Sequence, residues 1–179
     1  MNSYYSKTSF VIFEPLKVCL KLNMENKFYH ISRRSIREGA TLTQGIYGER
    51  VIDQHTVDNK YDLYIKEKIF EDVRTLQFPE LPSRLNCVFL YSNLDIAKFY
   101  WAYKHLYQAY IYEVEIVYGE PFLAEMDLLN CNKMRYTQMQ SNAKKYWSQT
   151  YHPDSVTLEC LLDGGAKVRG LIQGPSKIW

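Results

Sequence analysis

Long apolar segments are missing from this sequence of 179 residues. The longest apolar run near the start, Phe10 to Phe13, is broken by Glu14 and Pro15, so neither a signal-peptide core nor a membrane span fits there. The sequence also lacks a large excess of charge of either sign, because 22 basic and 20 acidic residues leave a net charge of +2. That charge is too small to predict a nucleic-acid or membrane surface by itself. We therefore expect a soluble, cytoplasmic protein that recognises any such partner through a local patch.

Motifs for metals, redox chemistry and common nucleotide folds are also missing. The four cysteines are scattered, with no C-x-x-C pair and no histidine at ligand spacing, which argues against a zinc site and a redox motif. No G-x-G-x-x-G or Walker sequence is present, so a Rossmann or P-loop protein is excluded. We expect no metal cofactor and reduced, mostly packed thiols.

What the chain does have is hydrophobic mass and tyrosine. Its length fits one compact domain, and a hydrophobic content of 46% is ample for a core without disulfides or a structural metal. Sixteen tyrosines supply most of the 15% aromatic content. Tyrosine rings can stack on nicotinamide, adenine or a nucleobase, but they also fill cores and interfaces, so the count permits base stacking without demonstrating it.

Residue patterns along the chain predict an α+β domain with a split, mostly antiparallel sheet and flanking helices. We set residues 1–26 apart as an N-terminal extension of opaque function and assign residues 27–179 to one domain. Residues 33–39 resemble one helical turn closed by Gly39, and residues 41–60 resemble a long loop. Helices are expected at residues 61–74, after a cap at Asn93 or Asp95, and within 133–150. Strands are expected at residues 27–32, 86–91, 109–117, 122–128, 156–162 and 166–172, the last two joined as a hairpin through Asp163-Gly164-Gly165.

Three short segments carry a pattern that resembles a known superfamily. The first is F-Y-H-I-S, residues 28–32; the second is residues 83–100, which include N-C-V-F-L-Y-S-N; the third is L-E-C-L-L-D-G-G, which starts at Leu158. In this order they resemble the ADP-ribosyltransferases of the histidine, tyrosine and glutamate type, which include the poly(ADP-ribose) polymerases and bacterial DNA-modifying toxins. Each motif is short and weak alone, so their order and spacing carry the specificity.

The resemblance implies an enzyme that uses NAD as substrate and roles for particular residues. Glu159 matches the catalytic glutamate, and His30 matches the histidine that hydrogen-bonds a ribose hydroxyl. The resemblance further places NAD against Ile31, Ser32, Arg33, Phe89, Tyr91 and Ser92. The ring expected to stack on nicotinamide is Phe89, with Tyr91 as the alternative on the same strand face. Phe89 departs from the family's pattern at that position.

Elementary chemistry agrees with the assignment of Glu159. Cleavage of the nicotinamide bond passes through an oxocarbenium-like ribose, and a carboxylate bound to the 2′-hydroxyl gains strength as positive charge develops. Glu159 lies among leucines, where an unpaired carboxylate would be costly unless something polar faces it. A glutamate on a solvated sheet face and a structural His30 are the plainer alternatives. Arginine can bind phosphate through two parallel hydrogen bonds, so the pyrophosphate could be held by Arg33, Arg34, Arg37 or Arg84.

The acceptor is expected to be a macromolecule, with RNA or DNA slightly favoured over protein. Tyr146, Trp147 and Tyr151 follow two lysines and could form an acceptor-binding patch, although a helix that packs its aromatic side into the core is the alternative. By family resemblance, a small transferase of this type is expected to be a toxin of a toxin-antitoxin or anti-phage system, with a cognate antitoxin. Two other functions stay open: an RNA 2′-phosphotransferase, and a non-catalytic module that binds RNA or peptide.

Overall fold

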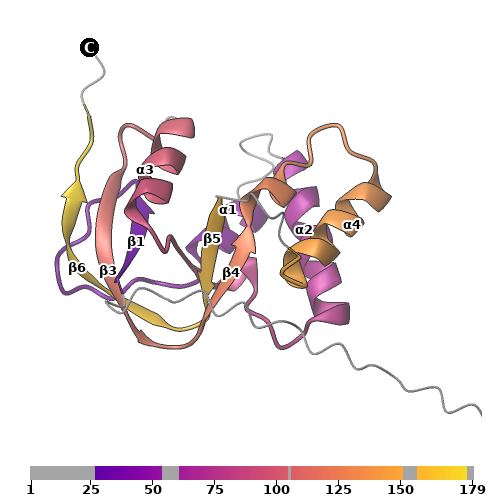
Figure 1. Ribbon diagram of the computed structural model, residues 1–179, viewed down its shortest axis with the longest axis horizontal. Helices are drawn as coiled ribbons and strands as arrows, with labels where there is room; N and C mark the ends of the chain where they lie inside the picture. Colours follow the sequence, from indigo (N-terminus) through magenta and orange to yellow (C-terminus); the bar gives the residue numbers. More distant parts are fainter. Residues whose placement is uncertain (1–26, 54–60, 105, 151–156, 177–179) are drawn as a thin grey trace, which may run out of the picture.

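The computed structural model describes residues 27–53, 61–104, 106–150 and 157–176. Within these residues the chain forms two three-stranded antiparallel sheets and four α-helices, which confirms the predicted α+β class with a split sheet (Figure 1). The predicted N-terminal extension, residues 1–26, lies outside the described part of the chain. No described helix combines the length and the apolar character that crossing a membrane requires.

The two sheets each have a central strand with antiparallel neighbours on both sides. In the first sheet β3 (Tyr110–Tyr118) lies between β1 (Lys27–Ser32) and β6 (Gly165–Gln173). In the second sheet β5 (Leu158–Leu162) lies between β2 (Val88–Leu90) and β4 (Pro121–Glu125). On β3, Val114 is buried while Glu113 and Glu115 are partly exposed.

The sheets meet where β1 approaches the end of β2. Tyr29 and Tyr91 form an antiparallel bridge in which each backbone N–H donates to the other's carbonyl at 2.8 Å. On the other side of β2, Leu90 pairs with Cys160 of β5, the residue that follows Glu159. Strands β1, β2 and β5, which carry the three segments of the family resemblance, are therefore neighbours.

The predicted hairpin at Asp163-Gly164-Gly165 is wrong, because β5 and β6 belong to different sheets. The turn instead carries the chain from one sheet to the other, and the turn between β3 and β4 does the same beside it. The two turns pack closely: a Cβ on Gly164 would lie 2.2 Å from the carbonyl oxygen of Tyr118, and one on Gly119 would lie 2.6 Å from that of Asp163. The glycines correctly predicted a turn after β5. A local pattern cannot show, however, with which strand β5 pairs.

Helices cover the two sheets separately. Helices α2 (Tyr61–Gln77) and α4 (Tyr136–Trp147) pack together over the second sheet, with α1 (Ile46–Asp53) beside the short 3-10 helix η1 (Arg84–Asn86). Helix α3 (Leu94–Tyr103) lies beside β1, away from α2 and α4 (Figure 1). Another 3-10 helix, η2 (Met126–Leu129), follows β4, so the predicted strand 122–128 ends earlier than expected.

Two local predictions near the start of the domain are wrong. Residues 33–39 contain bends and a turn but no helix, since the Ile36 N–H is bound by the Tyr112 hydroxyl at 2.8 Å and the chain turns at Gly39 with φ of +82°. The expected long loop at residues 41–60 contains α1, a helix of eight residues with an amphipathic pattern. At α3, Asn93 is the capping residue, because its Oδ1 accepts from the Asp95 N–H at 2.6 Å.

Three apolar clusters hold these layers together. The first lies between the sheets and includes Phe28 and Val114 from one sheet and Leu90 and Leu162 from the other. The second packs the far side of the second sheet against α2 and α4, and includes Phe70, Leu161 and Trp147. The third packs α3 against β1 and the end of β2. Polar side chains that face the second or third cluster must therefore find partners there.

Candidate functional site

A buried network of charge lies where α2, η1 and β5 meet. Arg84 stands between two carboxylates, Glu67 of α2 and Glu159 of β5, and the three residues are 4%, 1% and 5% exposed. Arg84 Nε donates to Glu67 Oε2 at 2.9 Å, and its Nη1 forms an ion pair with Glu159 Oε1. Buried charges of this kind persist only when they are paired and hydrogen-bonded. The arrangement therefore explains how a glutamate can sit on the leucine-rich strand β5.

Two tyrosine hydroxyls complete the network. The Tyr146 hydroxyl accepts from Arg84 Nη1 at 2.7 Å and donates to Glu159 Oε1 at 2.6 Å. The Tyr47 hydroxyl donates to Glu67 Oε1 at 2.8 Å, and the Lys66 ammonium lies 3.2 Å from the same oxygen. In the described part of the chain, both hydrogen bonds to the Glu159 side chain end on Oε1. That carboxylate is thus anchored through its Oε1.

The electrostatics of the network keep Glu67 and Arg84 charged. Burial opposes ionisation of Glu67, but the positive charges of Arg84 and Lys66 and the hydrogen bonds outweigh it and lower its pKa to about 2. Burial likewise acts against the Arg84 cation, yet the carboxylates of Glu159 and Glu67 raise its pKa well above the ordinary value. Two carboxylates therefore stay paired with one guanidinium and one ammonium, so the network has no large net charge.

Local sequence explains the position of each charged group. Ser83 caps η1, since its Oγ accepts from the Leu85 N–H at 3.2 Å, and this short turn holds Arg84 against α2. Glu67 lies three residues before Phe70, on the buried side of α2. Sequence reasoning selected Glu159 but missed Glu67 and Tyr47. A glutamate one helical turn before a core phenylalanine was the signal that could have revealed Glu67.

Three residues have places that differ from their predicted roles. Arg84 was a candidate for the NAD pyrophosphate, but it is buried and its donors are occupied by Glu67, Tyr146 and Glu159. Tyr146 and Trp147 were predicted to bind the acceptor, and this prediction is wrong because their rings are 0% and 1% exposed in the second core cluster. Tyr151, the third residue of that patch, lies outside the described residues.

His30 lies on β1 and is tied to β2. Its Nδ1 is 2.9 Å from the carbonyl oxygen of Phe89, and because a carbonyl only accepts, Nδ1 carries the proton and donates. Burial lowers the pKa of His30, although the Phe89 carbonyl acts in the opposite direction. The imidazole is thus neutral near pH 7, and its Nε2 is an acceptor. The hydrogen bond links His30 to Phe89 rather than to Glu159.

The aromatic rings near the junction fall into two groups. Phe89 packs against the edge of Tyr47, with centroids 5.0 Å apart, and the Arg84 guanidinium lies 5.1 Å from its centroid. Tyr91 contacts Tyr100 of α3, with centroids 5.4 Å apart. Burial raises the pKa of Tyr100, and the Glu159 carboxylate adds to this rise. Sequence reasoning did not single out Tyr100.

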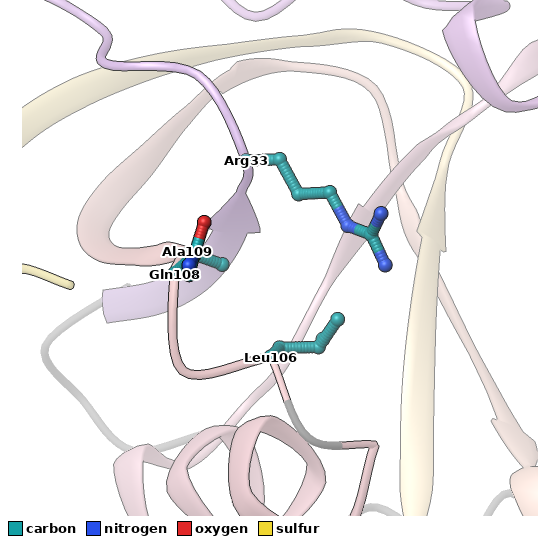
Figure 2. Close-up of a pocket in the computed structure, with 4 residues that line it drawn as sticks. All are labelled: Arg33, Leu106, Gln108 and Ala109. Carbon is teal, nitrogen blue, oxygen red and sulfur yellow. The ribbon is translucent and has the colours of Figure 1, made fainter. Parts of the chain in front are cut away.

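The remaining predicted NAD-binding residues lie at the end of β1 and the start of α3. Ile31 is half-buried in the third cluster, and the Ser32 hydroxyl donates to the Arg34 carbonyl at 2.8 Å. Ser92 is half-buried between β2 and α3. A surface hollow of about 300 Å³ is lined by Arg33, Leu106, Gln108 and Ala109. Figure 2 shows the Arg33 side chain extending from the end of β1 into the same space as the side chain of Leu106.

Among the described residues, no group of three or more histidine, cysteine or acidic side chains has the arrangement of a metal site. Arg34 and Arg37 are exposed.

Cys87, Cys131 and Cys160 are buried free thiols, and burial raises the pKa of Cys160 to about 12. These three thiols are therefore protonated and unreactive at neutral pH.

These features define an α+β protein with a split antiparallel sheet and a buried Glu–Arg–Glu network at the junction of its strands. Residues 16–174 match the family described as Protein of unknown function (DUF2441), and the chain belongs to this family. The match begins within the segment that we set apart as an N-terminal extension. No curated protein matches the chain.

Proposed function

We propose that this protein is an NAD-dependent mono-ADP-ribosyltransferase that transfers ADP-ribose to a macromolecule. The observation that supports this best is the placement of the three segments of the resemblance. His30 and Glu159 lie on β1 and β5, and Tyr91, directly after β2, bridges to Tyr29 of β1. Strand β2 itself pairs with β5. Nothing in the sequence required segments so far apart along the chain to be adjacent.

Glu159 would stabilise the transition state through its second oxygen. Arg84 and Tyr146 hold Oε1, so Oε2 can accept a hydrogen bond from the 2′-hydroxyl of the nicotinamide ribose. In the reaction the bond between ribose C1′ and the nicotinamide nitrogen breaks, and nicotinamide leaves with the bonding electrons as a neutral molecule. A nucleophilic atom of the acceptor then bonds to C1′ and releases a proton. A fixed carboxylate favours the oxocarbenium-like state because it needs no reorientation as charge develops.

Other residues would bind NAD. A neutral His30 with its proton on Nδ1 offers Nε2 to a ribose hydroxyl. The nicotinamide ring would stack on the Tyr91 and Tyr100 pair rather than on Phe89, which already contacts Tyr47 and the Arg84 guanidinium. Arg33 at the hollow beside β1 would pair with the pyrophosphate.

The biological role that fits this chemistry is a toxin of a toxin-antitoxin or anti-phage defence system. This part of the proposal rests on the resemblance alone, including the cognate antitoxin that such a toxin would need. Expression in a bacterial host should slow growth with the wild-type gene and not with Glu159→Gln. Equal growth of both strains, with equal amounts of folded protein, would remove the toxin from the proposal.

The direct test is nicotinamide release from NAD by purified protein, with and without added RNA or single-stranded DNA. We expect release by the wild type and none by Glu159→Gln, whereas Glu113→Gln, a partly exposed glutamate of β3, should behave as the wild type. Circular dichroism and thermal unfolding would confirm that each variant is folded. Release that does not depend on Glu159, or no release under any condition, would refute the proposal.

A second function, a non-catalytic module that binds RNA or peptide, is favoured by one observation. Glu159 is 5% exposed and its charge is matched by Arg84, as a purely structural carboxylate would require. Such a module would bind its partner with equal affinity in the wild type and in Glu159→Gln, and would neither bind nor consume NAD. Isothermal titration with NAD distinguishes the two functions without relying on turnover.

A further inference from the structure

The outer face of α3 carries two exposed aromatic rings. Phe99 and Tyr103, one helical turn apart, are 54% and 61% exposed. Their rings are stacked, with centroids 5.8 Å apart and an angle of 6° between the planes. Most residues of an amphipathic helix that are this exposed are polar, so a flat aromatic pair in this position indicates a contact surface. A further flat ring could extend such a stack.

Positive charge flanks the two rings. The Lys104 ammonium lies 4.8 Å from the centroid of Tyr103 and 5.9 Å from that of Tyr100, and Lys98 is exposed next to Phe99. Asp95 is the acidic residue on the same exposed side of the helix, at its first turn. Around the ring pair itself the charge is therefore positive. A partner with planar rings and negative charge would complement this face.

The same face is continuous with the candidate site. Tyr100 contacts Tyr91, with ring centroids 5.4 Å apart, and Tyr91 follows Leu90, which pairs with Cys160, the residue after Glu159. Lys104 lies over both Tyr100 and Tyr103, so it joins the inner pair of rings to the outer pair. A row of rings with one ammonium thus runs from the neighbourhood of Glu159 to the exposed face of α3. A chain that binds the outer rings could reach the site.

We propose that Lys98, Phe99, Tyr103 and Lys104 form a docking surface for single-stranded nucleic acid, which would present the acceptor to Glu159. A base stacks on the Phe99 and Tyr103 pair, and the two ammonium groups meet backbone phosphates. A single strand fits better than a duplex, since the bases of a duplex are already stacked on each other. The binding surface stands on the geometry of α3, whereas the acceptor role rests on the proposed transferase function. This surface on α3 replaces the predicted acceptor patch at Tyr146 and Trp147, which is buried.

The test measures binding of a short fluorescein-labelled RNA, and of DNA with the same sequence, by fluorescence anisotropy without NAD. Replacing both rings, Phe99→Ala with Tyr103→Ala, should raise the Kd about tenfold or more, because base stacking on them is lost. Replacing both lysines with glutamine should reduce the slope of log affinity against log salt by ~0.7 for each. Tyr136→Ala is the matched control, since Tyr136 is an equally exposed ring, 59%, on α4.

Each result supports or overturns the surface independently of the enzyme. Weaker binding by the α3 variants and not by Tyr136→Ala supports it, even if the wild type releases no nicotinamide and the transferase proposal fails. Absence of binding by the wild type, or equal binding by the ring variants, overturns it, even if nicotinamide release depends on Glu159.

Discussion

Arg84 forms a buried ion pair with Glu159, a residue 75 positions further along the chain. The contact joins η1 to β5, and Tyr146 fixes it by hydrogen bonds to both partners. Glu67 occupies the other side of the same guanidinium. The orientation of the predicted catalytic glutamate is thus set by a residue that sequence reasoning had considered for phosphate binding.

Removing Arg84 should destabilise the fold strongly. Arg84→Met leaves Glu67 and Glu159 as buried carboxylates without their main partner, which typically costs about 3–5 kcal/mol. Urea unfolding would measure the change. Arg169→Met, which breaks the exposed pair with Glu115, is the control and should change stability by less than about 1 kcal/mol. A loss of stability in Arg84→Met as small as that in Arg169→Met would show that the Arg84 network does not support the fold.

Loss of the Tyr146 hydroxyl should distinguish a role in positioning Glu159 from a role in binding NAD. Tyr146→Phe keeps the buried ring but removes the hydroxyl that holds Glu159 Oε1. If the proposed reaction is correct, kcat for nicotinamide release should fall while KM for NAD stays nearly constant, because the Glu159 interaction strengthens only in the transition state. Steady-state kinetics would measure both. An unchanged kcat with a lower melting temperature would assign Tyr146 a structural role only.

Protonation of His30 should weaken the fold at mildly acidic pH. Burial lowers its pKa below the ordinary value of 6.5, so the unfolded chain binds the proton more readily than the folded one. The neutral His30 imidazole thus stabilises the fold above about pH 6.5, and this contribution to the free energy of unfolding is lost as the pH falls below that value. Between about pH 7.5 and pH 5, the free energy of unfolding should therefore fall more in the wild type than in His30→Asn. Asparagine can still donate to the Phe89 carbonyl but does not titrate; equal falls would contradict the prediction.

The contact between the two crossover turns should not tolerate a side chain. In Gly164→Ala the new Cβ would meet the Tyr118 carbonyl oxygen at 2.2 Å, so backbone must move, at a cost of about 1–3 kcal/mol. Gly170→Ala on β6 is the control, since a Cβ there has nothing within 4 Å. Thermal unfolding of both variants would check the difference. Equal melting temperatures would mean that the turns are not in contact.

Local patterns in the sequence predicted much of the secondary structure. Strand β1 at residues 27–32 agrees with its predicted bounds, and α2 and β3 lie close to theirs. Their periodic apolar residues and caps act over a few positions, which is the range that local sequence controls. The prediction failed at α1, an eight-residue helix that was taken for part of a loop, and at the supposed hairpin of β5 and β6. Strand pairing depends on residues far apart along the chain, so no local pattern specifies it.

The candidate site was predicted in part. Glu159 and His30 could be selected from short motifs, and the cost of an unpaired carboxylate on a leucine-rich strand required a polar partner for Glu159. Neither observation could name that partner. Arg84, Glu67 and Tyr47 come from three different elements, η1, α2 and α1 respectively, and local sequence cannot show that these residues meet.

By itself, the sequence determined the α+β class, most helices and strands, and the suspicion that His30 and Glu159 are functional. These follow from periodicity, turn residues and the free energy of burying particular side chains. Only the tertiary structure decided that the last two strands lie in different sheets, that Tyr146 and Trp147 are in the core, and that Arg84 binds Glu159. Each of these depends on long-range packing, because elements far apart along the chain determine whether a given side chain is buried and what it contacts.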